Sequence, residues 1–481
     1  MKMRPGLQTG FLLCGREWTD GETFEVRSPW DQGLVGRVTK ATRNDARQAV
    51  THAVSSVRRT RALPRWKRGE ILRAVADALV AQRERFEQLI VAEAGKPIRQ
   101  ARTEVDRSIF TFRTAAEEAV RLGGESIPLD LCEGNEGRWG VVQRFPVGPV
   151  LAITPFCFPL NLVAQKLAPA MAAGCPVILK PSPLAPFTAL ALGEVILKSG
   201  WPDEALAVLP LSDEDTSWLA AKDDRIKLIS FTGSSKVGWE LKANSGRKRV
   251  LLELGGNAAL IVHSDWADLD VAAARTAQAA FGYAGQSCTS VQRIFVERPI
   301  FQTFLWKVVE RAARMTPGDP ALDTTESGPM ISLAEAERVE SWIKEAVSGG
   351  AKLVQGGERN GSLINPAILT ATQPGMKLRD EEVLGPVVTI EPYDDFEEAV
   401  AQANHSRYGL QAGLLTRDAR RIITAFRELE VGALIVGDTP SWRLDPMPFG
   451  GVKDSGLGRE GIRYAIEEMT EPRMMVMAIP G

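Results

Sequence analysis

One cysteine and one glutamate stand out as residues suited to covalent chemistry. Cys288 lies between small polar residues in the segment 283–290, with Gly285 three positions before it. Glu253 lies at the end of an apolar run, and it is followed by a leucine and then by two glycines. A thiol that attacks a carbonyl and a carboxylate that activates water are the groups that acyl chemistry through a covalent intermediate requires. A lone cysteine is more often a small buried apolar residue, so the prediction depends on the surrounding motifs.

Six short segments support the catalytic interpretation. In chain order they are Ile-Thr-Pro-Phe-Cys-Phe-Pro-Leu (153–160), Phe-Thr-Gly-Ser (231–234), Leu-Glu-Leu-Gly-Gly (252–256), Gly-Gln-Ser-Cys (285–288), Glu-Glu-Val-Leu-Gly-Pro (381–386) and Pro-Phe-Gly-Gly (448–451). As a set, in this order, they resemble the aldehyde dehydrogenase superfamily, and the resemblance covers nearly the whole chain. Residues 283–291 and 446–460 most resemble the lactaldehyde and non-phosphorylating glyceraldehyde-3-phosphate dehydrogenase branch.

This resemblance implies NAD(P)-dependent oxidation of an aldehyde to a free acid. The Cys288 thiolate would add to the aldehyde, hydride would pass to the nicotinamide, and Glu253 would activate the water that hydrolyses the thioester. The branch of the family that transfers the acyl group to coenzyme A generally lacks a glutamate here, so Glu253 favours hydrolysis. The family also implies a homodimer or homotetramer.

Cys157 departs from the family pattern at a catalytic position. In the family, an asparagine side chain here donates a hydrogen bond to the oxyanion, alongside the backbone N–H of the nucleophile. A thiol is a weak donor, and loss of one oxyanion donor typically costs about 10²–10³ in rate. Three explanations follow: the enzyme is slow, a water or hydroxyl replaces the amide, or Cys157 pairs reversibly with Cys288.

The cofactor site is expected where the predicted strand 226–231 meets a helix at Gly233. A helix N-terminus without a side chain in the way is suited to a pyrophosphate. Three positions after Lys180, where NAD-preferring relatives often carry an acid, the chain has Pro183, so we expect NAD or NADP to serve. The resemblance assigns cofactor contacts to Thr154, Pro155, Lys180, Ser182, Gly233, Ser234, Val237, Leu254, Glu382 and Leu384.

Two of these cofactor residues carry open questions. Lys180 could instead form a surface salt bridge. Leu384 replaces a phenylalanine that packs on the nicotinamide in the family. A Gly-x-Gly-x-x-Gly pattern at 456–461 follows a loop, where the dinucleotide fingerprint requires a strand, so we do not interpret it as the phosphate site.

The substrate clues are four residues. Arg113 and Arg443 lie in segments that line the substrate tunnel in relatives, and Ser287 and Thr289 flank the nucleophile. Two arginines would bind a carboxylate, phosphate or sulfonate through forked hydrogen bonds, although structural ion pairs explain each equally well. The sequence therefore favours a short hydroxylated or anionic aldehyde.

The elements that position these residues alternate between strands and helices. Apolar runs at 150–154, 177–180, 205–209, 226–231 and 249–254 predict buried parallel strands, and helical patterns lie between them. Strand 258–262 and a helix through Phe281 then deliver Cys288 on a loop. Asn44 is the expected N-cap of the first helical region and Gly95 its C-terminal stop. We predict an α/β fold with two doubly wound parallel sheets and a small β ribbon.

The same alternation gives a domain division. We expect an NAD(P)-binding domain at 1–124 and 146–255, and a catalytic domain at 256–453. Segments 125–145 and 454–481 would form a ribbon and tail that, by the resemblance, contact another subunit.

Composition excludes several other classes of protein. The chain has 481 residues, a formal net charge of −2 and 44% hydrophobic residues, which is ordinary for a soluble protein and offers no field for nucleic acid. No apolar run reaches the roughly 18 residues of a membrane span, and we expect a cytoplasmic protein. Five scattered cysteines and three histidines predict neither disulfides nor a metal site.

Two other functions remain open at this level. Cys157 and Leu384 would suit a catalytically weakened, nucleotide-binding oligomer, which aldehyde turnover would exclude. A related enzyme that forms an activated acyl group would be recognised by its product.

Overall fold

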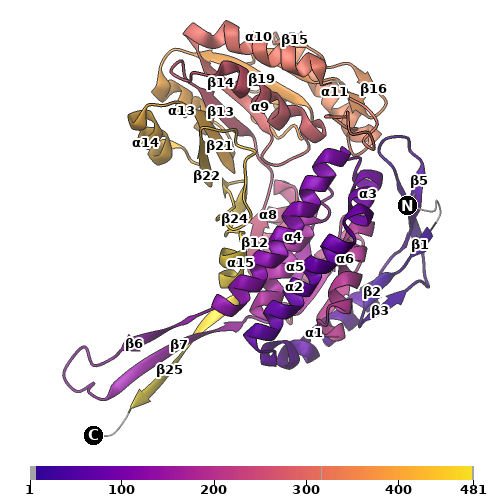
Figure 1. Cartoon of the computed structure of the whole chain (residues 1–481), viewed down its shortest axis with the longest axis vertical. Coiled ribbons are helices and arrows are strands. Elements are labelled where there is room, and N and C mark those ends of the chain that lie inside the picture. The colour runs from indigo at the N-terminus through magenta and orange to yellow at the C-terminus, as the bar shows by residue number, and fades with distance from the viewer. Residues whose placement is uncertain (1–6, 316, 479–481) are drawn as a thin grey trace.

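The computed structural model describes residues 7–315 and 317–478. The predicted first domain and the predicted tail therefore extend slightly beyond the described residues. Two large sheets and two three-stranded sheets make up most of the strand structure (Figure 1). Over the described residues, no helix is long and apolar enough to cross a membrane.

The larger sheet has eight strands in the order β24-β12-β11-β8-β9-β10-β2-β3. Their bounds are β2 (Phe11–Leu13), β3 (Arg16–Trp18), β8 (Val150–Ile153), β9 (Val177–Lys180), β10 (Leu206–Val208), β11 (Leu228–Thr232), β12 (Arg249–Glu253) and β24 (Gly456–Leu457). The five central strands, β12 to β10, pair in parallel. β24 pairs antiparallel with β12, so the Gly-x-Gly-x-x-Gly pattern begins on an edge strand rather than after a parallel one.

Helices cover both faces of this sheet because its strands are apolar on both sides. Val150 and Ala152 belong to one core, and Leu151 and Ile153 belong to the other, as alternation along a strand requires. The first core packs under α2 (Arg65–Ala81), α3 (Arg83–Ala94), α4 (Ile98–Arg121), α5 (Asn161–Ala173), α6 (Phe187–Lys198) and α15 (Ile462–Glu468). The second packs under α1 (Arg43–Ala62), α7 (Asp213–Lys222) and α8 (Ser235–Asn244).

The helix ends agree with the sequence at one position and differ at another. Gly95 ends α3 in the left-handed region at φ 64°, where glycine is favoured. The N-cap of α1 is Thr42 rather than Asn44. Thr42 accepts a hydrogen bond from the Asp45 N–H while the Asp45 carboxylate accepts one from the Thr42 N–H. This reciprocal pair satisfies two helix-terminal donors at once.

The second large sheet has seven strands in the order β15-β18-β19-β14-β13-β21-β22. Its strands are β13 (Ala258–Val262), β14 (Val291–Glu297), β15 (Lys352–Gln355), β18 (Ala367–Thr370), β19 (Val387–Tyr393), β21 (Gln411–Leu415) and β22 (Ala433–Val436). Its helices are α9 (Leu269–Phe281), α10 (Arg298–Arg314), α11 (Leu333–Ser348), α12 (Lys377–Asp380), α13 (Phe396–Asn404) and α14 (Ala419–Glu428). All pairs except β15–β18 are parallel, which confirms the predicted fold class.

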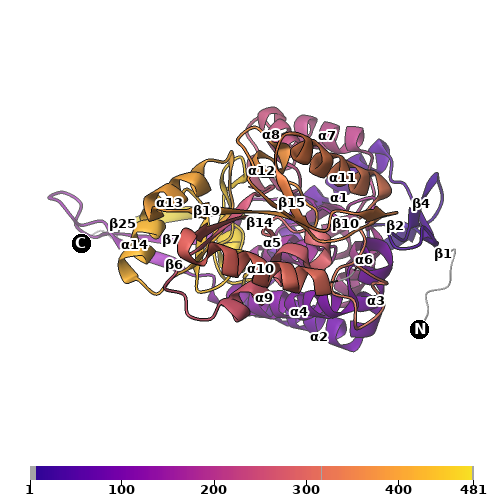
Figure 2. The same cartoon turned by 90° about the horizontal axis from the view of Figure 1, so that it is seen from above.

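A ribbon of three antiparallel strands projects from the body (Figure 1). It consists of β6 (Gly124–Pro128), β7 (Arg138–Pro146) and β25 (Thr470–Ala478). Seen from above, it extends on the side opposite to β1 (Leu7–Thr9) and β4 (Thr23–Arg27), which pair with β5 (Leu34–Thr39) (Figure 2). Met474, Met475 and Val476 on β25 are about half exposed. A role in subunit contact remains a prediction, as do the domain boundaries.

Short elements complete the fold. They are the 3₁₀ turns η1 (Asp203–Ala205) and η2 (Gly282–Gly285) and the strand pairs β16 (Arg359–Asn360) with β17 (Leu363–Ile364) and β20 (Tyr408–Gly409) with β23 (Val452–Lys453).

Candidate active site

The turn η2 holds the loop that carries Cys288 in one conformation. Tyr283 and Ala284 both have φ 52°, which is uncommon for residues with a side chain, and Gly285 follows at φ 67°. A Cβ on Gly285 would lie 2.2 Å from the Gly385 carbonyl oxygen, so only glycine fits. Buried Gln286 donates to the Pro329 carbonyl and accepts from the Ile331 N–H, at 3.1 and 2.7 Å. The loop before the nucleophile is therefore fixed on both sides.

Glu253 meets this loop from the other large sheet. It is the last residue of β12, and three residues later the chain passes so close that a Cβ on Gly256 would lie 2.4 Å from the Cys288 carbonyl oxygen. The Glu253 side chain is buried, and its Oε2 has no hydrogen-bond partner among the described residues. Burial, and then the neighbouring Glu460, raise the pKa of Glu253. An unpartnered buried carboxylate with a raised pKa is suited to accept a proton from water.

The pKa of Cys288 is raised by its poorly solvated surroundings and by acidic neighbours. Burial contributes most, followed by Cys157, Glu253 and Glu382, whereas Arg443 lowers it. These influences place the three predicted catalytic residues, Cys288, Glu253 and Cys157, within one electrostatic environment.

Cys157 lies in the loop between β8 and α5, and it is a free, buried thiol. Burial raises its pKa to about 12, and Lys96 is the cation that lowers it most. Its apolar neighbours include Leu162 and Tyr283, the second of which belongs to η2. The thiol therefore stays protonated near neutral pH, which leaves it a weak donor and keeps a second negative charge away from an oxyanion.

A buried ion-pair network behind Glu253 was missed in the sequence. Lys166 donates to Glu460 at 2.7 Å and to the Ser230 hydroxyl at 3.0 Å, and Arg443 lies 3.8 Å from Glu460. The one signal in the sequence was Lys166 itself, a charged residue within the largely apolar helix α5, whose residues are all buried. A charge in such a helix needs a partner, although its partner 294 residues away could not be identified.

A second buried cluster joins two arginines to one aspartate. Asp445 accepts from Arg107 at 2.7 Å, from Gln165 at 2.6 Å and from Thr111 at 3.1 Å. Arg443 donates to the other end of Gln165 and stacks 3.5 Å from the centre of the Phe449 ring. The Nε atoms of both arginines lack hydrogen-bond partners among the described residues.

The predicted substrate residue Arg113 does not join this cluster. Its side chain is 55% exposed, and the partner it reaches is Asp77 at 3.9 Å. Arg107 and Arg113 share α4, but six residues at 3.6 per turn leave their side chains about a third of a turn apart. Arg113 therefore lies outside this cluster, and its role in substrate binding remains a prediction. Ser287 and Thr289 do flank Cys288, and their hydroxyls lie 3.3 Å apart.

The residues expected to bind the cofactor gather at the carboxyl ends of β8, β9, β11 and β12. Ser234 caps α8 by accepting from the Val237 N–H, and Gly233 precedes it without a side chain. Lys180 ends β9, and buried Ser182 follows it. Thr154 and Pro155 follow β8, and Leu254 follows β12.

An NAD(P) molecule fits the surroundings of these residues. A cavity of about 340 Å³ lies between α7 and α8, with Ile153, Lys180, Phe231 and Val237 among its lining residues. The buried Thr232 hydroxyl beside Gly233 has no partner among the described residues. The open helix terminus, the unpartnered hydroxyl and the adjoining cavity suit a pyrophosphate that carries a nucleoside.

Glu382 and Leu384 lie across from the β12 end. Glu382 accepts a hydrogen bond from the Gly256 N–H at 3.0 Å, and burial raises its pKa to about 7. A Cβ on Gly255 would lie 2.2 Å from Glu382 Oε2, so a side chain at residue 255 would displace the Glu382 carboxylate from its present position. Leu384 adopts φ 44°, an uncommon conformation for leucine that suggests the segment is held tightly.

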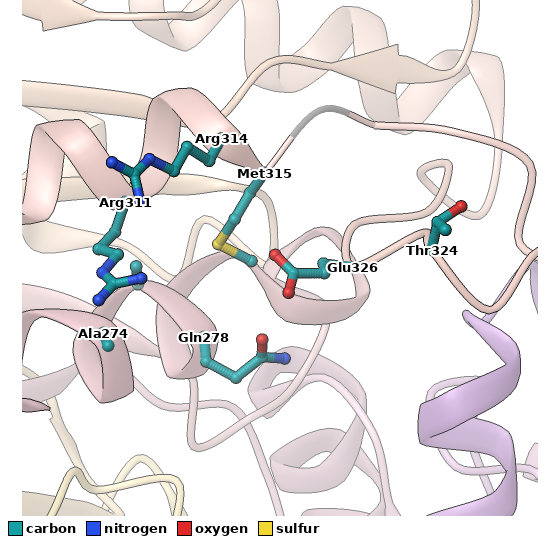
Figure 3. Close-up of a pocket in the computed structure, with 8 residues that line it drawn as sticks. Ala274, Gln278, Arg311, Arg314, Met315, Thr324 and Glu326 are labelled. Carbon is teal, nitrogen blue, oxygen red and sulfur yellow. The ribbon is translucent and has the colours of Figure 1, made fainter.

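A larger cavity of about 480 Å³ lies between α9 and α10, away from these residues. Figure 3 shows Gln278, Met315 and Glu326 directed toward it, with Arg311 and Arg314 on α10. None of its lining residues is a nucleophile, and Arg314 pairs with Glu310. This cavity therefore does not include Cys288, the predicted nucleophile.

A comparison with protein families identifies the chain. The model of the aldehyde dehydrogenase family matches residues 18–475. The chain belongs to the aldehyde dehydrogenase family. It is therefore an enzyme that oxidises aldehydes, as the six sequence segments predicted.

Relatives of this aldehyde dehydrogenase agree with the predicted branch. The 3-sulfolactaldehyde dehydrogenase of Priestia megaterium is 44% identical over 471 residues, covering 98% of each chain. The lactaldehyde dehydrogenase of Methanococcus vannielii is 39% identical, covering 97% of this chain and 99% of its own.

Solved structures extend the comparison to bound molecules. Aldehyde dehydrogenase 21 of Physcomitrella patens, in complex with its reaction product succinate, has a TM-score of 0.96 at 40% identity, covering 99% of both chains. The glyceraldehyde-3-phosphate dehydrogenase of Methanocaldococcus jannaschii, complexed with NADP, has a TM-score of 0.92 at 36% identity, covering 96% of this chain and 100% of its own.

Proposed function

We propose that this enzyme oxidises a short aldehyde with an anionic tail to the free carboxylic acid, with NAD or NADP as the hydride acceptor. The observation that carries the proposal is the pair Arg107 and Arg443. Both lie beside the buried Asp445, and Arg443 is the cation that lowers the pKa of Cys288. Arg107, Arg443 and Lys166 are three cations that share the acids Asp445 and Glu460, so one positive charge of this group remains available to an anionic substrate.

The protein's part in the first half of the reaction is addition by sulfur. The Cys288 thiolate forms a bond to the aldehyde carbon, and the carbonyl oxygen becomes an oxyanion. The backbone N–H of Cys288 is one donor to that oxyanion, and the thiol of Cys157 is a weak second one. The chemistry that the cofactor supplies when bound is acceptance of a hydride, which leaves a thioester on Cys288.

Glu253 acts in the second half. Its unpartnered carboxylate takes a proton from water while the water oxygen bonds to the thioester carbon, and the carbon–sulfur bond breaks to release the acid. The network of Lys166, Glu460 and Arg443 next to Glu253 provides the polar surroundings in which that proton is held.

The names of the relatives support an acidic substrate. They include dehydrogenases of 3-sulfolactaldehyde and aspartate semialdehyde, and one structure contains succinate. A sulfonate or carboxylate would occupy the positive side of the site, and a hydroxyl group could reach Ser287 or Thr289.

The test is formation of NADH or NADPH from a panel of short aldehydes under reductant, with identification of the product. The proposal expects a free acid and the highest kcat/KM for an aldehyde with a charged tail. An activated acyl product would contradict hydrolysis, and a preference for uncharged aldehydes would contradict the anionic substrate.

Replacement of Arg107 by methionine should remove the preference for a charged tail. We expect kcat/KM for 3-sulfolactaldehyde to fall by about 10–100-fold because a charge-assisted hydrogen bond is lost. Lactaldehyde, which lacks the sulfonate, should change by less than about threefold. Arg113→Met is the matched control on the same helix, and it should alter neither substrate; equal losses for both substrates with Arg107→Met would contradict the assignment.

The raised pKa of Cys288 predicts how the cofactor-free enzyme responds to pH. The thiolate reacts with iodoacetamide, and below its pKa the thiolate fraction rises about tenfold per pH unit. The inactivation rate should therefore keep rising from pH 7 to pH 9 without a plateau. Peptide mapping identifies the modified cysteine, and a plateau below pH 8 for Cys288 would show that its pKa is not raised.

A further inference from the structure

We propose that Asp213 makes this enzyme bind NAD more tightly than NADP. The inference rests on the proposed use of a nicotinamide cofactor and adds the residue that selects between the two. Pro183, three positions after Lys180, supplies no charge. Asp213 at the start of α7 supplies a carboxylate to Lys180 from a different element instead.

The cavity between α7 and α8 is the place where a nucleoside would lie. It is bounded by residues at the carboxyl ends of β8, β9 and β11, and it adjoins the N-terminus of α8. Parallel sheets of this kind bind nucleotides at that edge, with phosphates on the helix terminus. Ile153, Val237 and Leu241 give the cavity apolar walls for a flat base, and Lys180 gives it a polar end.

The charged residues that line the cavity do not favour binding of a phosphate group there. Lys180 is the one cation among the described lining residues, whereas Asp213 and Glu240 are acids. The Lys180 side chain is 8% exposed, and its ammonium lies 3.1 Å from Asp213 Oδ1. The positive charge that could attract a phosphate is therefore already paired.

The Lys180–Asp213 pair should interact differently with the 2′-hydroxyl of NAD and the 2′-phosphate of NADP. A ribose 2′-hydroxyl can donate a hydrogen bond to a carboxylate such as Asp213. A 2′-phosphate has only acceptors and carries a charge of about −1.5 to −2, so it would compete with Asp213 for Lys180 and be repelled by it. Because Asp213 is 94% exposed, its removal should not disturb folding.

Equilibrium binding of NAD and NADP, measured by calorimetry without any aldehyde, tests this inference. The native enzyme should bind NAD at least about tenfold more tightly than NADP. Asp213→Asn should bind NADP more tightly and lower the ratio of the two dissociation constants by about tenfold. Glu214→Gln is the matched control, because Glu214 is the next residue, pairs with Arg43 and does not line the cavity.

Three results would overturn the inference. They are equal affinity of the native enzyme for both cofactors, an unchanged ratio in Asp213→Asn, and an equal shift in Glu214→Gln. Each of these leaves aldehyde oxidation intact. Absence of binding by either cofactor would overturn the proposed function as well, so the two failures can be distinguished.

Discussion

The Cys288→Ser variant is expected to lose NADH or NADPH formation with every aldehyde tested, by about 10³-fold or more. A hydroxyl in this position is a much weaker nucleophile than a thiol, and the described groups that influence the pKa of Cys288 include no histidine that could activate it. Serine is only slightly smaller than cysteine, and η2 and Gln286 hold the loop without any contribution from the Cys288 side chain. The expected loss is therefore chemical and not structural.

Two controls separate these causes. Cofactor binding by Cys288→Ser should match the native enzyme, and its thermal unfolding should be unchanged. Cys157→Ser should retain aldehyde oxidation, because Cys157 is assigned to the oxyanion and not to the attack. If Cys288→Ser kept a tenth or more of native kcat while Cys157→Ser was inactive, the nucleophile would be misassigned.

The second large effect is a gain of activity in Cys157→Asn. An asparagine amide is a full hydrogen-bond donor, and one oxyanion donor is typically worth about 10²–10³ in kcat. Cys157 is buried between Leu162 and Tyr283, and the asparagine side chain differs little in size from the thiol it replaces. Steady-state kcat measured under reductant, with Cys157→Ala alongside, gives the contribution of the thiol itself.

The result with Cys157→Asn distinguishes a slow enzyme from one in which another donor replaces the amide. A large gain in Cys157→Asn shows that the missing amide limits the native rate. An unchanged kcat shows that another donor already serves the oxyanion. An inactive native enzyme that Cys157→Asn restores would indicate a weakened active site on an intact fold.

The features that the sequence predicted well are those set by neighbours in the chain. The strands at 150–154 and 177–180 were recognisable because both of their faces are buried, which makes them continuously apolar. Gly95 was recognisable as a helix stop because few other residues tolerate its conformation. Cys288 and Glu253 each belong to a distinctive short segment, and their catalytic roles remain predictions.

The features that the sequence did not reveal depend on contacts between distant segments. Lys166 and Glu460 are ordinary charged residues until the fold pairs them in the interior. The sequence could not show that Arg107 reaches Asp445 whereas Arg113 on the same helix does not. Asp213 replaces the acid that is absent at Pro183, and it does so from another helix. In each case the information lies in tertiary packing and not in local pattern.

The central claim is that an acyl group is carried on Cys288 and released by water that Glu253 activates. Its most direct test is to mix Glu253→Gln with an aldehyde and NAD, then follow NADH and the mass of the intact protein. The account predicts about one NADH per active site followed by a near stop, as expected when release alone is blocked. An adduct equal to the aldehyde less two hydrogen atoms should map to Cys288. Continued turnover at the native rate, or a stop without an adduct on Cys288, would contradict the account.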